Sequence, residues 1–340
     1  MKNMQKHIAA NLLNANVATS FTLLVLTAFW AACSTPTVSS DDSDVGSEKV
    51  EQEDRSSSSD MSNSKEADRS SSSEKKTESS SSEKTSESSS SSANEINCAA
   101  LLEEHTGWSW NVPKVCRFNP DIEYGIMTDE RDGKVYRTVK IGNQVWMAEN
   151  LNYADSVKTP SLLERSWCFD DEPKNCDVTG RLYTWAAAID SVELYRDMSI
   201  DCGSYKACTL PDTVYGICPS GWHLPTETEW EALITNIGGS ISRNGQTWNS
   251  DVGQVLKSKT GWKEWSYFGN GTDTYGFSAL PAGIRSSFDG SFHSDETDFW
   301  SSTENDEAVW SVWLYYGNSV ANLISIAAKY NGCSVRCVKD

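Results

Sequence analysis

The sequence predicts a domain of the α+β class, with two helices against a small, twisted, mostly antiparallel sheet and long loops, preceded by a disordered serine-rich linker. Three observations support this prediction: a hairpin pattern over residues 135–147, a capped amphipathic pattern over 226–237, and short strand patterns separated by Gly, Asn and Asp after residue 240. Strands that are grouped with few helices, rather than alternating with them, are typical of this class.

Residues 1–32 have the features of an export signal. Lys2 and Lys6 give a positive start, and the apolar run over residues 21–32 is shorter than the roughly 20 residues that a membrane-spanning helix needs. Two alanines precede Cys33, an arrangement that resembles a bacterial lipoprotein signal, in which the cysteine becomes the acylated N-terminus. We therefore expect lipidation of Cys33 and a lipoprotein of the cell envelope, in the outer membrane. Cleavage as an ordinary secretory signal is the alternative.

Residues 33–93 are predicted to form a disordered linker. They are nearly devoid of large apolar residues and contain serine blocks such as SSSSEKTSESSSSS. Such a segment cannot bury enough apolar surface to offset the loss of backbone entropy, so we expect a flexible, solvated spacer. The folded part then consists of a cysteine-containing lead-in segment, residues 94–127, and a main domain, residues 128–340.

The first element of the main domain is a predicted β-hairpin. Val135, Val139 and Ile141 lie at alternating positions in GKVYRTVKIGNQVWM, and Gly142-Asn143 is a strong turn signal between two apolar runs. We expect the two runs to pair as antiparallel strands.

Two helices are predicted after the hairpin. Residues 181–190 (RLYTWAAAID) favour a helix through three alanines and the spacing of their large apolar residues. The second helix starts at Thr226, which forms a capping box with Glu229, and its apolar positions recur at i, i+3, i+4 and i+7. The helix dipole favours the carboxylates of its first turn. His223 is expected to be a buried or half-buried structural residue, because no nucleophile motif accompanies it.

The ten cysteines predict disulfides, since an exported chain folds in an oxidising compartment. Spacing favours three local pairs, Cys98 with Cys116, Cys168 with Cys176 and Cys202 with Cys208. Cys333 and Cys337 lie in one predicted strand, which would separate their Cα atoms by about 13 Å, beyond the about 7 Å that a disulfide allows. One of them is therefore expected to bond Cys218. CxxC-type spacing is absent, so neither a metal site nor a cofactor is expected.

The charge of the chain argues against nucleic-acid partners. The net charge is −19 and no basic stripe is present, so phosphate backbones would be repelled. An acidic run follows residue 293 in HSDETDFWSSTENDE, with carboxylates at Asp295, Glu296, Asp298, Glu304, Asp306 and Glu307. These oxygens suit Ca²⁺, but the run lacks the fixed spacing of a calcium loop, so a solvated loop is expected.

Six segments in order carry a family resemblance: KIGNQVWMAENLNY, GRLYTWAAAID, CPSGWHLPTETEWEAL, GFSALPAGIR, FWSSTE and SVRCVKD. Together they resemble the Fibrobacter succinogenes major paralogous domain over residues 128–340, a family without an established biochemical activity. GWHLPTETEWEAL is also similar to a signature of the formylglycine-generating enzyme and sulfatase-modifying group, as is SVRC to that group's final strand. This second resemblance implies a C-type-lectin-like core in which a Cys218–Cys337 disulfide joins the terminal strand to the first half of the domain.

Two function classes follow. The first is a non-catalytic binding or adhesion module, because lectin-like folds present loops to ligands and aromatic rings can stack on plant cell-wall polysaccharide. The segment GWKEWSYFGNG offers Trp262, Trp265, Tyr267 and Phe268 as the candidate surface, with core packing as the alternative for each ring. The second class is an oxidase like the formylglycine-generating enzymes, which use two C-terminal cysteine thiols. The spacing and flanks of Cys333 and Cys337 do not reproduce that pattern, so no enzymatic activity is expected.

Overall fold

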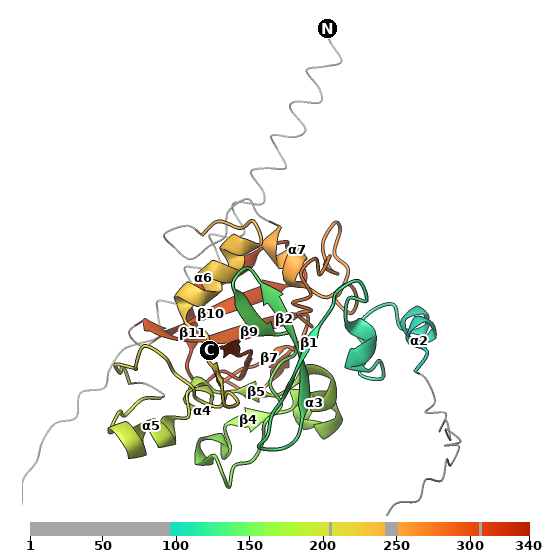
Figure 1. Cartoon of the computed structure of the whole chain (residues 1–340). Coiled ribbons are helices and arrows are strands. Elements are labelled where there is room, and N and C mark those ends of the chain that lie inside the picture. Colours follow the sequence, from blue (N-terminus) through green and yellow to red (C-terminus); the bar gives the residue numbers. More distant parts are fainter. Residues whose placement is uncertain (1–95, 204–205, 242–250, 306–307) are drawn as a thin grey trace, which may run out of the picture. The chain divides into compact units, whose positions relative to one another are not determined.

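The computed structural model describes residues 96–203, 206–241, 251–305 and 308–340 (Figure 1), which belong to one compact unit. The predicted signal, Cys33 and the serine-rich linker lie outside the described residues. Among the described helices, none is long and apolar enough to cross a membrane. The domain has the predicted α+β character, with few, short helices and curled, mostly antiparallel sheets.

The helices are one to three turns long. The α-helices are α2 (Cys98–Glu104), α3 (Pro173–Thr179), α4 (Trp185–Ala188), α5 (Ser191–Met198), α6 (Glu227–Asn236) and α7 (Val252–Leu256), and the 3₁₀ helices are η1 (Lys114–Arg117), η2 (Pro160–Leu162) and η3 (Phe169–Asp171). The prediction of two helices is too low, because most of these elements are too short to show an amphipathic repeat. Helix α6 begins as predicted: the Thr226 hydroxyl accepts a hydrogen bond from the Glu229 amide (3.2 Å), and the Glu229 carboxylate accepts one from the Thr226 amide (2.8 Å).

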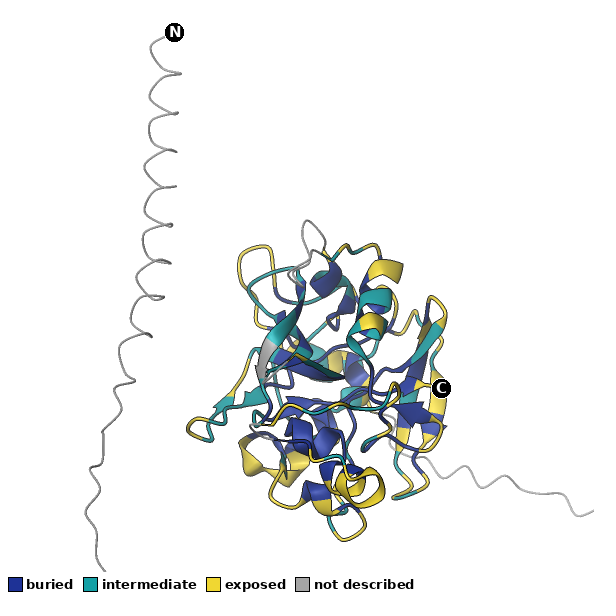
Figure 2. Cartoon of the chain, turned by 90° about the vertical axis from the view of Figure 1, so that its left-hand side faces the viewer, coloured by how far each residue is buried: buried dark blue, intermediate teal, exposed yellow. Residues whose placement is uncertain are grey.

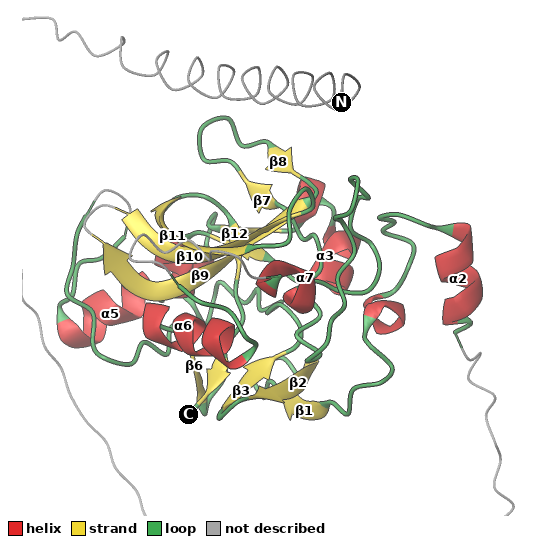
Figure 3. Ribbon diagram, turned by 90° about the horizontal axis from the view of Figure 1, so that it is seen from above, coloured by secondary structure: helices red, strands yellow, loops and turns green. Residues whose placement is uncertain are grey.

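The strands form two main sheets and a small hairpin (Figure 3). The strands are β1 (Gly125–Thr128), β2 (Val135–Ile141), β3 (Gln144–Met147), β4 (Ser166–Trp167), β5 (Leu182–Tyr183), β6 (Trp222–His223), β7 (Ile284–Arg285), β8 (Phe292–His293), β9 (Glu296–Asn305), β10 (Ala308–Tyr315), β11 (Ala321–Ala328), β12 (Cys333–Ser334) and β13 (Val338–Lys339). The first sheet has the order β1-β2-β3-β13-β6, and the second β11-β10-β9-β12-β5-β4. All pairs between these strands are antiparallel apart from β9 with β12.

The predicted hairpin corresponds to β2 and β3. Ile141 pairs with Gln144 across the Gly142-Asn143 turn. Gly142 has a φ of 60°, a left-handed conformation that glycine adopts without steric cost. The turn prediction is therefore confirmed together with its physical reason.

Residues 181–190 form a strand and a short helix instead of the single predicted helix. Strand β5 pairs with β12 on one side and with β4 on the other. Helix α4 begins only after Thr184, whose hydroxyl accepts a hydrogen bond from the Ala187 amide at 3.2 Å. Strand pairing at both edges of β5 thus overrides the helix propensity of the neighbouring alanines.

The carboxyl-terminal segment connects the two main sheets. Strand β12 lies between β5 and β9 in one sheet, and β13 lies between β3 and β6 in the other. The prediction of one continuous strand over residues 333–337 is wrong, because the chain changes sheets there. The carbonyl of Val335 accepts a hydrogen bond from the Leu151 amide (2.9 Å), and that of Cys337 accepts one from the Met147 amide (3.1 Å).

Four disulfides hold the described part of the chain together. They join Cys98 to Cys116, Cys168 to Cys176, Cys202 to Cys208 and Cys218 to Cys337. These are the three local pairs that the spacing favours and the long-range pair that the family resemblance implies. Cys333 is the odd cysteine, and its thiol is buried.

Two hydrophobic clusters form the core. Figure 2 shows the buried segments of the chain in dark blue. One lies between the β2–β3 hairpin, α6 and α7, and the strands β9–β11. At its centre, the ring of Trp230 lies 4.5 Å from that of Trp146 and 5.8 Å from that of Phe299. The other cluster surrounds Trp185 and Trp300 and includes Cys333. Burial of each such aromatic side chain contributes about 1.5–3 kcal/mol.

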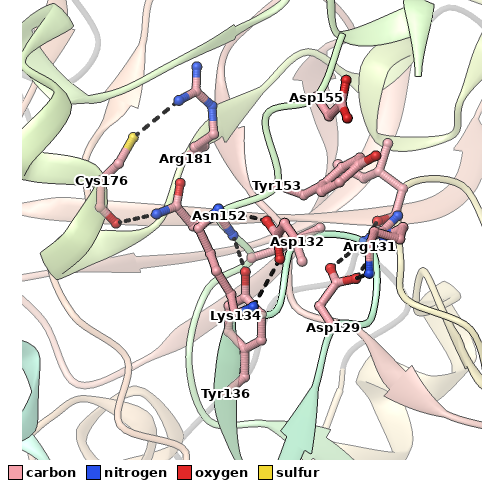
Figure 4. A network of polar contacts seen from close by, with 12 residues as sticks. Asp129, Arg131, Asp132, Lys134, Tyr136, Asn152, Tyr153, Asp155, Cys176 and Arg181 are labelled. Atoms are coloured by element: carbon pink, nitrogen blue, oxygen red, sulfur yellow. Dashed lines mark hydrogen bonds and ion pairs between the residues drawn. The ribbon is translucent and has the colours of Figure 1, made fainter. Parts of the chain in front are cut away.

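A polar network connects the turn between β1 and β2 to more distant segments (Figure 4). Arg131 donates two hydrogen bonds to Asp129 (2.9 and 2.7 Å) and one to the carbonyl of Ile217 (2.9 Å), and its guanidinium lies 3.8 Å from the Tyr153 ring centroid. Nearby, the backbone N–H of Asn152 donates a hydrogen bond to the Tyr136 hydroxyl (3.0 Å). The hydrogen bonds of Arg131 therefore hold the turn between β1 and β2 against the segment that contains Ile217.

His223 is a structural residue, as predicted. Its Nδ1 lies 2.7 Å from Asp340 Oδ1 and its Nε2 lies 2.8 Å from Glu229 Oε1. The hydrogen bond to Glu229, together with that to Asp340, raises the pKa of His223 above its ordinary value. Burial alone would raise the pKa of Glu229, but the hydrogen bonds from His223 and Thr226 lower it. The ring therefore connects helix α6 to Asp340 through hydrogen bonds on both of its nitrogen atoms.

A His223→Gln variant is expected to lose stability in a window of pH. Because the pKa of His223 is raised in the folded protein, its contribution to the unfolding free energy is fully present below about pH 6.5. This contribution disappears as the pH rises through the raised pKa. Because the pKa of Glu229 is lowered, the contribution of that carboxylate is lost only in acid. Urea unfolding should therefore show the largest deficit of the variant near pH 6 and a smaller one near pH 9. His293→Gln, which changes a half-exposed ring, is the control; a deficit for His223→Gln that does not change with pH would contradict the assignment.

Candidate functional site

Three of the four aromatic residues predicted as a ligand-binding surface are exposed. The exposed fractions in the loop 262–270 are 57% for Trp265, 94% for Tyr267 and 37% for Phe268. The prediction is wrong for Trp262, whose side chain is fully buried. Its indole Nε1 donates to the carbonyl of Ala279 at 2.9 Å, and its ring belongs to the core cluster around Trp230. Trp262 therefore attaches the loop to the core, and the other three residues face solvent.

The loop is held closed by its own hydrogen bonds. Trp265 and Phe268 exchange two backbone hydrogen bonds, of 3.1 and 2.9 Å, around a tight turn in which Ser266 has a φ of 54°. The Trp262 amide donates to Asn270 Oδ1 at 2.8 Å. These bonds fix the loop locally, so its exposed rings are presented by an ordered backbone.

Further aromatic side chains continue this surface on strand β10 and the residue after it. The Trp265 ring lies 6.1 Å from Tyr316, the Tyr316 ring 4.4 Å from Tyr315, and the Tyr315 ring 5.4 Å from Trp313, with the last pair stacked. We call Trp265, Tyr316, Tyr315 and Trp313 the aromatic strip. The sequence analysis missed its last three members. Alternation along β10 places Trp313 and Tyr315 on the face opposite Val312 and Leu314, but only the fold brings that face to Trp265.

Two polar groups, one buried and one partly buried, hold the aromatic strip in place. Lys257 Nζ donates to the carbonyls of Tyr315 (2.5 Å) and Asn318 (2.7 Å), and burial lowers the pKa of Lys257 to about 8. The indole Nε1 of Trp313 donates to Glu296 Oε2 at 2.6 Å, and burial raises the pKa of Glu296. Lys257 thus holds the backbone of the strip at Tyr315, and Glu296, the cross-strand partner of Tyr315, orients the Trp313 ring.

A hollow of about 600 Å³ adjoins the aromatic strip, a volume within the range of small-molecule sites. Its walls are residues 106–108, Lys263, Glu264, Asp295 and the edge of Trp262. Lys263 connects the hollow to the strip, because its Nζ lies 3.4 Å from Asp295 Oδ2 and 4.8 Å from the Tyr316 ring centroid. The hollow itself is lined by an ammonium group, carboxylates and the side chains of Trp108 and Trp262, and Lys263 links it to the rings of the aromatic strip.

The lead-in segment contributes the opposite wall of the hollow. Trp108 lies 4.9 Å from Trp110 by ring centroids, Trp110 lies 5.3 Å from Phe169, and Phe169 lies 5.3 Å from Phe292. Aromatic contacts therefore extend away from the hollow on this side as well. The Cys98–Cys116 disulfide joins the two ends of the lead-in segment on either side of Trp108.

The acidic run after residue 293 does not form the expected solvated loop. Glu296 and Asp298 lie in strand β9, where Asp298 is buried, and burial raises the pKa of Asp298 to about 7. Asp306 and Glu307 lie outside the described residues. Within the described ranges, no group of three or more His, Cys, Asp or Glu side chains is placed to hold a metal ion.

The two C-terminal cysteines do not form a thiol pair. Cys337 is bonded to Cys218, and Cys333 lies in the core, where burial raises the pKa of its thiol well above the ordinary value. The thiolate that a cysteine oxidase requires is therefore disfavoured at Cys333.

A family model for the Fibrobacter succinogenes major domain (Fib_succ_major) matches residues 139–339, more than half of the chain. The chain belongs to this family. Comparisons with curated proteins and with solved structures find no match. The Fibrobacter succinogenes major domain contains the loop 262–270 and the rest of the aromatic strip, whereas Trp108 and Trp110 precede the matched residues. The hollow therefore lies where the family domain meets the lead-in segment.

Proposed function

We propose that this member of the Fibrobacter succinogenes major domain family is a non-catalytic binding or adhesion module for polysaccharide. The aromatic strip beside the hollow carries the proposal. Sugar rings have apolar C–H faces and hydroxyl edges, so a complementary site combines flat aromatic rings with a few polar groups. Trp265 and Tyr316 supply rings in mutual contact, and Lys263, Glu264 and Asp295 supply donors and acceptors in the neighbouring hollow.

The preformed loop supports this function energetically. Tyr and Trp give a large contact area while losing little conformational entropy, because each side chain has only two torsions. The backbone bonds between Trp265 and Phe268 already order the loop before a ligand arrives. Plant cell-wall polysaccharide is the ligand class that we propose.

We further propose a C-type-lectin-like core for the domain. The Cys218–Cys337 disulfide supports it, because it joins the segment before α6 to the terminal segment as the resemblance to the sulfatase-modifying group implies. The long loop that carries Trp265 supports it as well. The proposed setting is the outer membrane, with Cys33 as the lipid attachment site and residues 33–93 as a spacer between the lipid and the domain.

Depletion of the full chain from solution by insoluble cellulose tests the function. The chain, purified from an oxidising compartment, is expected to bind in a saturable manner. A Trp265→Ala/Tyr267→Ala variant is expected to bind about 10- to 30-fold more weakly, as for the loss of central aromatic contacts.

The matched control is Phe288→Ala, because Phe288 is 97% exposed in the turn between β7 and β8 and is not a member of the aromatic strip or of the lining of the hollow. This variant should bind like the unchanged chain. Unbound protein at every cellulose loading would reject this ligand. Equal binding by the double variant and the control would show that Trp265 and Tyr267 are not part of the binding surface.

A further inference from the structure

A small cavity lies beneath the lead-in segment, separate from the hollow. Its volume is about 20 Å³, enough for one water molecule or an ion of similar size. Lys114 and Arg117 of η1 line it from one side, and Glu149, Asn150 and Arg336 line it from the core. Three cationic side chains and one carboxylate therefore border a space for a single small species.

Arg117 lacks the partners that a buried guanidinium needs. The residue is 2% exposed, and only its Nη2 is used, donating to the Ser109 carbonyl at 3.2 Å. Nε and Nη1 are buried and have no hydrogen-bond partner among the described residues. Burial lowers the pKa of Arg117 to about 10, and no carboxylate offsets it. The Trp108 ring, 4.6 Å from the guanidinium, supplies a cation–π contact but accepts no hydrogen bond in its place.

The other charged groups at the cavity have ion-pair or hydrogen-bond partners. Lys114 forms an ion pair with Glu149, and the second carboxylate oxygen of Glu149 accepts a hydrogen bond from the Arg137 amide at 2.8 Å. Arg336 donates to Asn150 Oδ1 (2.8 Å) and to the carbonyls of Phe277, Ser278 and Met147. Among these three cationic side chains, Arg117 is therefore the one that has buried N–H donors without a hydrogen-bond partner in the described part of the chain.

A glycine, Gly261, packs against the Arg117 guanidinium and the Trp108 ring, and it is not among the residues that line the cavity. A Cβ atom on Gly261 would lie 2.5 Å from Arg117 Nη1, so any side chain at this position would press against the guanidinium. A buried, unpaired charge is strongly unfavourable, whereas a buried charge with an ion partner and satisfied hydrogen bonds is tolerated. A water molecule would accept a hydrogen bond but would not balance the charge.

We propose that this cavity binds a monovalent anion of chloride size, which accepts hydrogen bonds from the Arg117 guanidinium. The anion joins the lead-in segment to the core of the domain. Because Arg117 also stacks on Trp108, the bound anion holds the wall of the hollow that Trp108 forms.

Chloride itself is the probe for the test. In ³⁵Cl nuclear magnetic resonance of the full chain, excess line broadening should saturate with chloride and be displaced by bromide. In thermal unfolding, the midpoint should rise by about 3–5 °C for each tenfold increase of chloride above its dissociation constant. Sodium gluconate at equal ionic strength, whose anion exceeds the cavity, should not produce this rise.

Two variants locate the effect. Arg117→Gln is expected to abolish the saturable broadening and the chloride dependence, whereas Lys259→Gln, which removes an equal charge from a surface pair with Asp121, should keep both. Equal midpoints in chloride and gluconate without saturable broadening of the unchanged chain would overturn the proposal, whether or not Arg117→Gln folds. A chloride effect of undiminished size in Arg117→Gln would overturn it as well.

Discussion

A chain with Cys218→Ser and Cys337→Ser is expected to lose about 5 kcal/mol of unfolding free energy, because this disulfide restricts a long segment of the unfolded chain. The two cysteines are 119 residues apart in sequence. In the chain-entropy model, the free-energy contribution of a disulfide grows with the logarithm of the closed loop. A loss of this size is comparable to the entire stability of many domains. Urea unfolding under non-reducing conditions, with extrapolation to water, measures it.

The matched control is the short-range pair Cys202→Ser and Cys208→Ser. These cysteines are 6 residues apart, so the same model gives a loss of about 2 kcal/mol. Both double variants remove one disulfide and add two hydroxyl groups. Equal losses for the two would show that loop closure does not govern the stability of this domain.

Replacement of a buried acid is expected to stabilise the protein at neutral and alkaline pH. Burial raises the pKa of Asp298 to about 7, and its Oδ1 has no hydrogen-bond partner among the described residues. Between the ordinary pKa of about 4 and about 7, the unfolded chain ionises while the folded chain retains the proton. Unfolding free energy therefore falls as the pH rises through this range, by up to about 4 kcal/mol in total, and it is flat above it. Asp298→Asn keeps the shape of the side chain and removes the titration.

Urea unfolding at pH 4.5 and pH 8 checks this expectation. Relative to the unchanged chain, Asp298→Asn should gain stability from the lower to the higher pH. Asp121→Asn is the control, because its carboxylate is 77% exposed and pairs only with Lys259. A difference between Asp298→Asn and the unchanged chain that is the same at both pH values would contradict the raised pKa.

The parts of the fold that sequence patterns predict are those that local chemistry decides. The Thr226–Glu229 capping box and the Gly142-Asn143 turn are complete within a few residues, and both form as predicted. The break between β12 and β13 is different. Its cause is the pairing of Cys333 with β5 and of Val338 with β3, strands that lie more than a hundred residues earlier in the chain.

The candidate site is predictable only in part for the same reason. The loop 262–270 is recognisable by its density of aromatic residues. A pattern of Trp and Tyr does not indicate which of these rings is buried, so Trp262 is predicted to be exposed although it lies in the core. Trp108 and Asp295 border one hollow although 187 positions separate them in the chain. Their proximity depends on how the sheets and the lead-in segment pack together.

The position of β12 and β13 also sets the order in which the molecule can be completed. Each fills a gap between two strands that precede it in the chain, so neither main sheet is continuous without residues 333–339. A nascent chain lacking them exposes unpaired strand edges on both sides of an unfinished interior, together with an unpartnered Cys218 thiol. A chain truncated before residue 333 is therefore expected to leave both main sheets interrupted and the Cys218–Cys337 disulfide unformed.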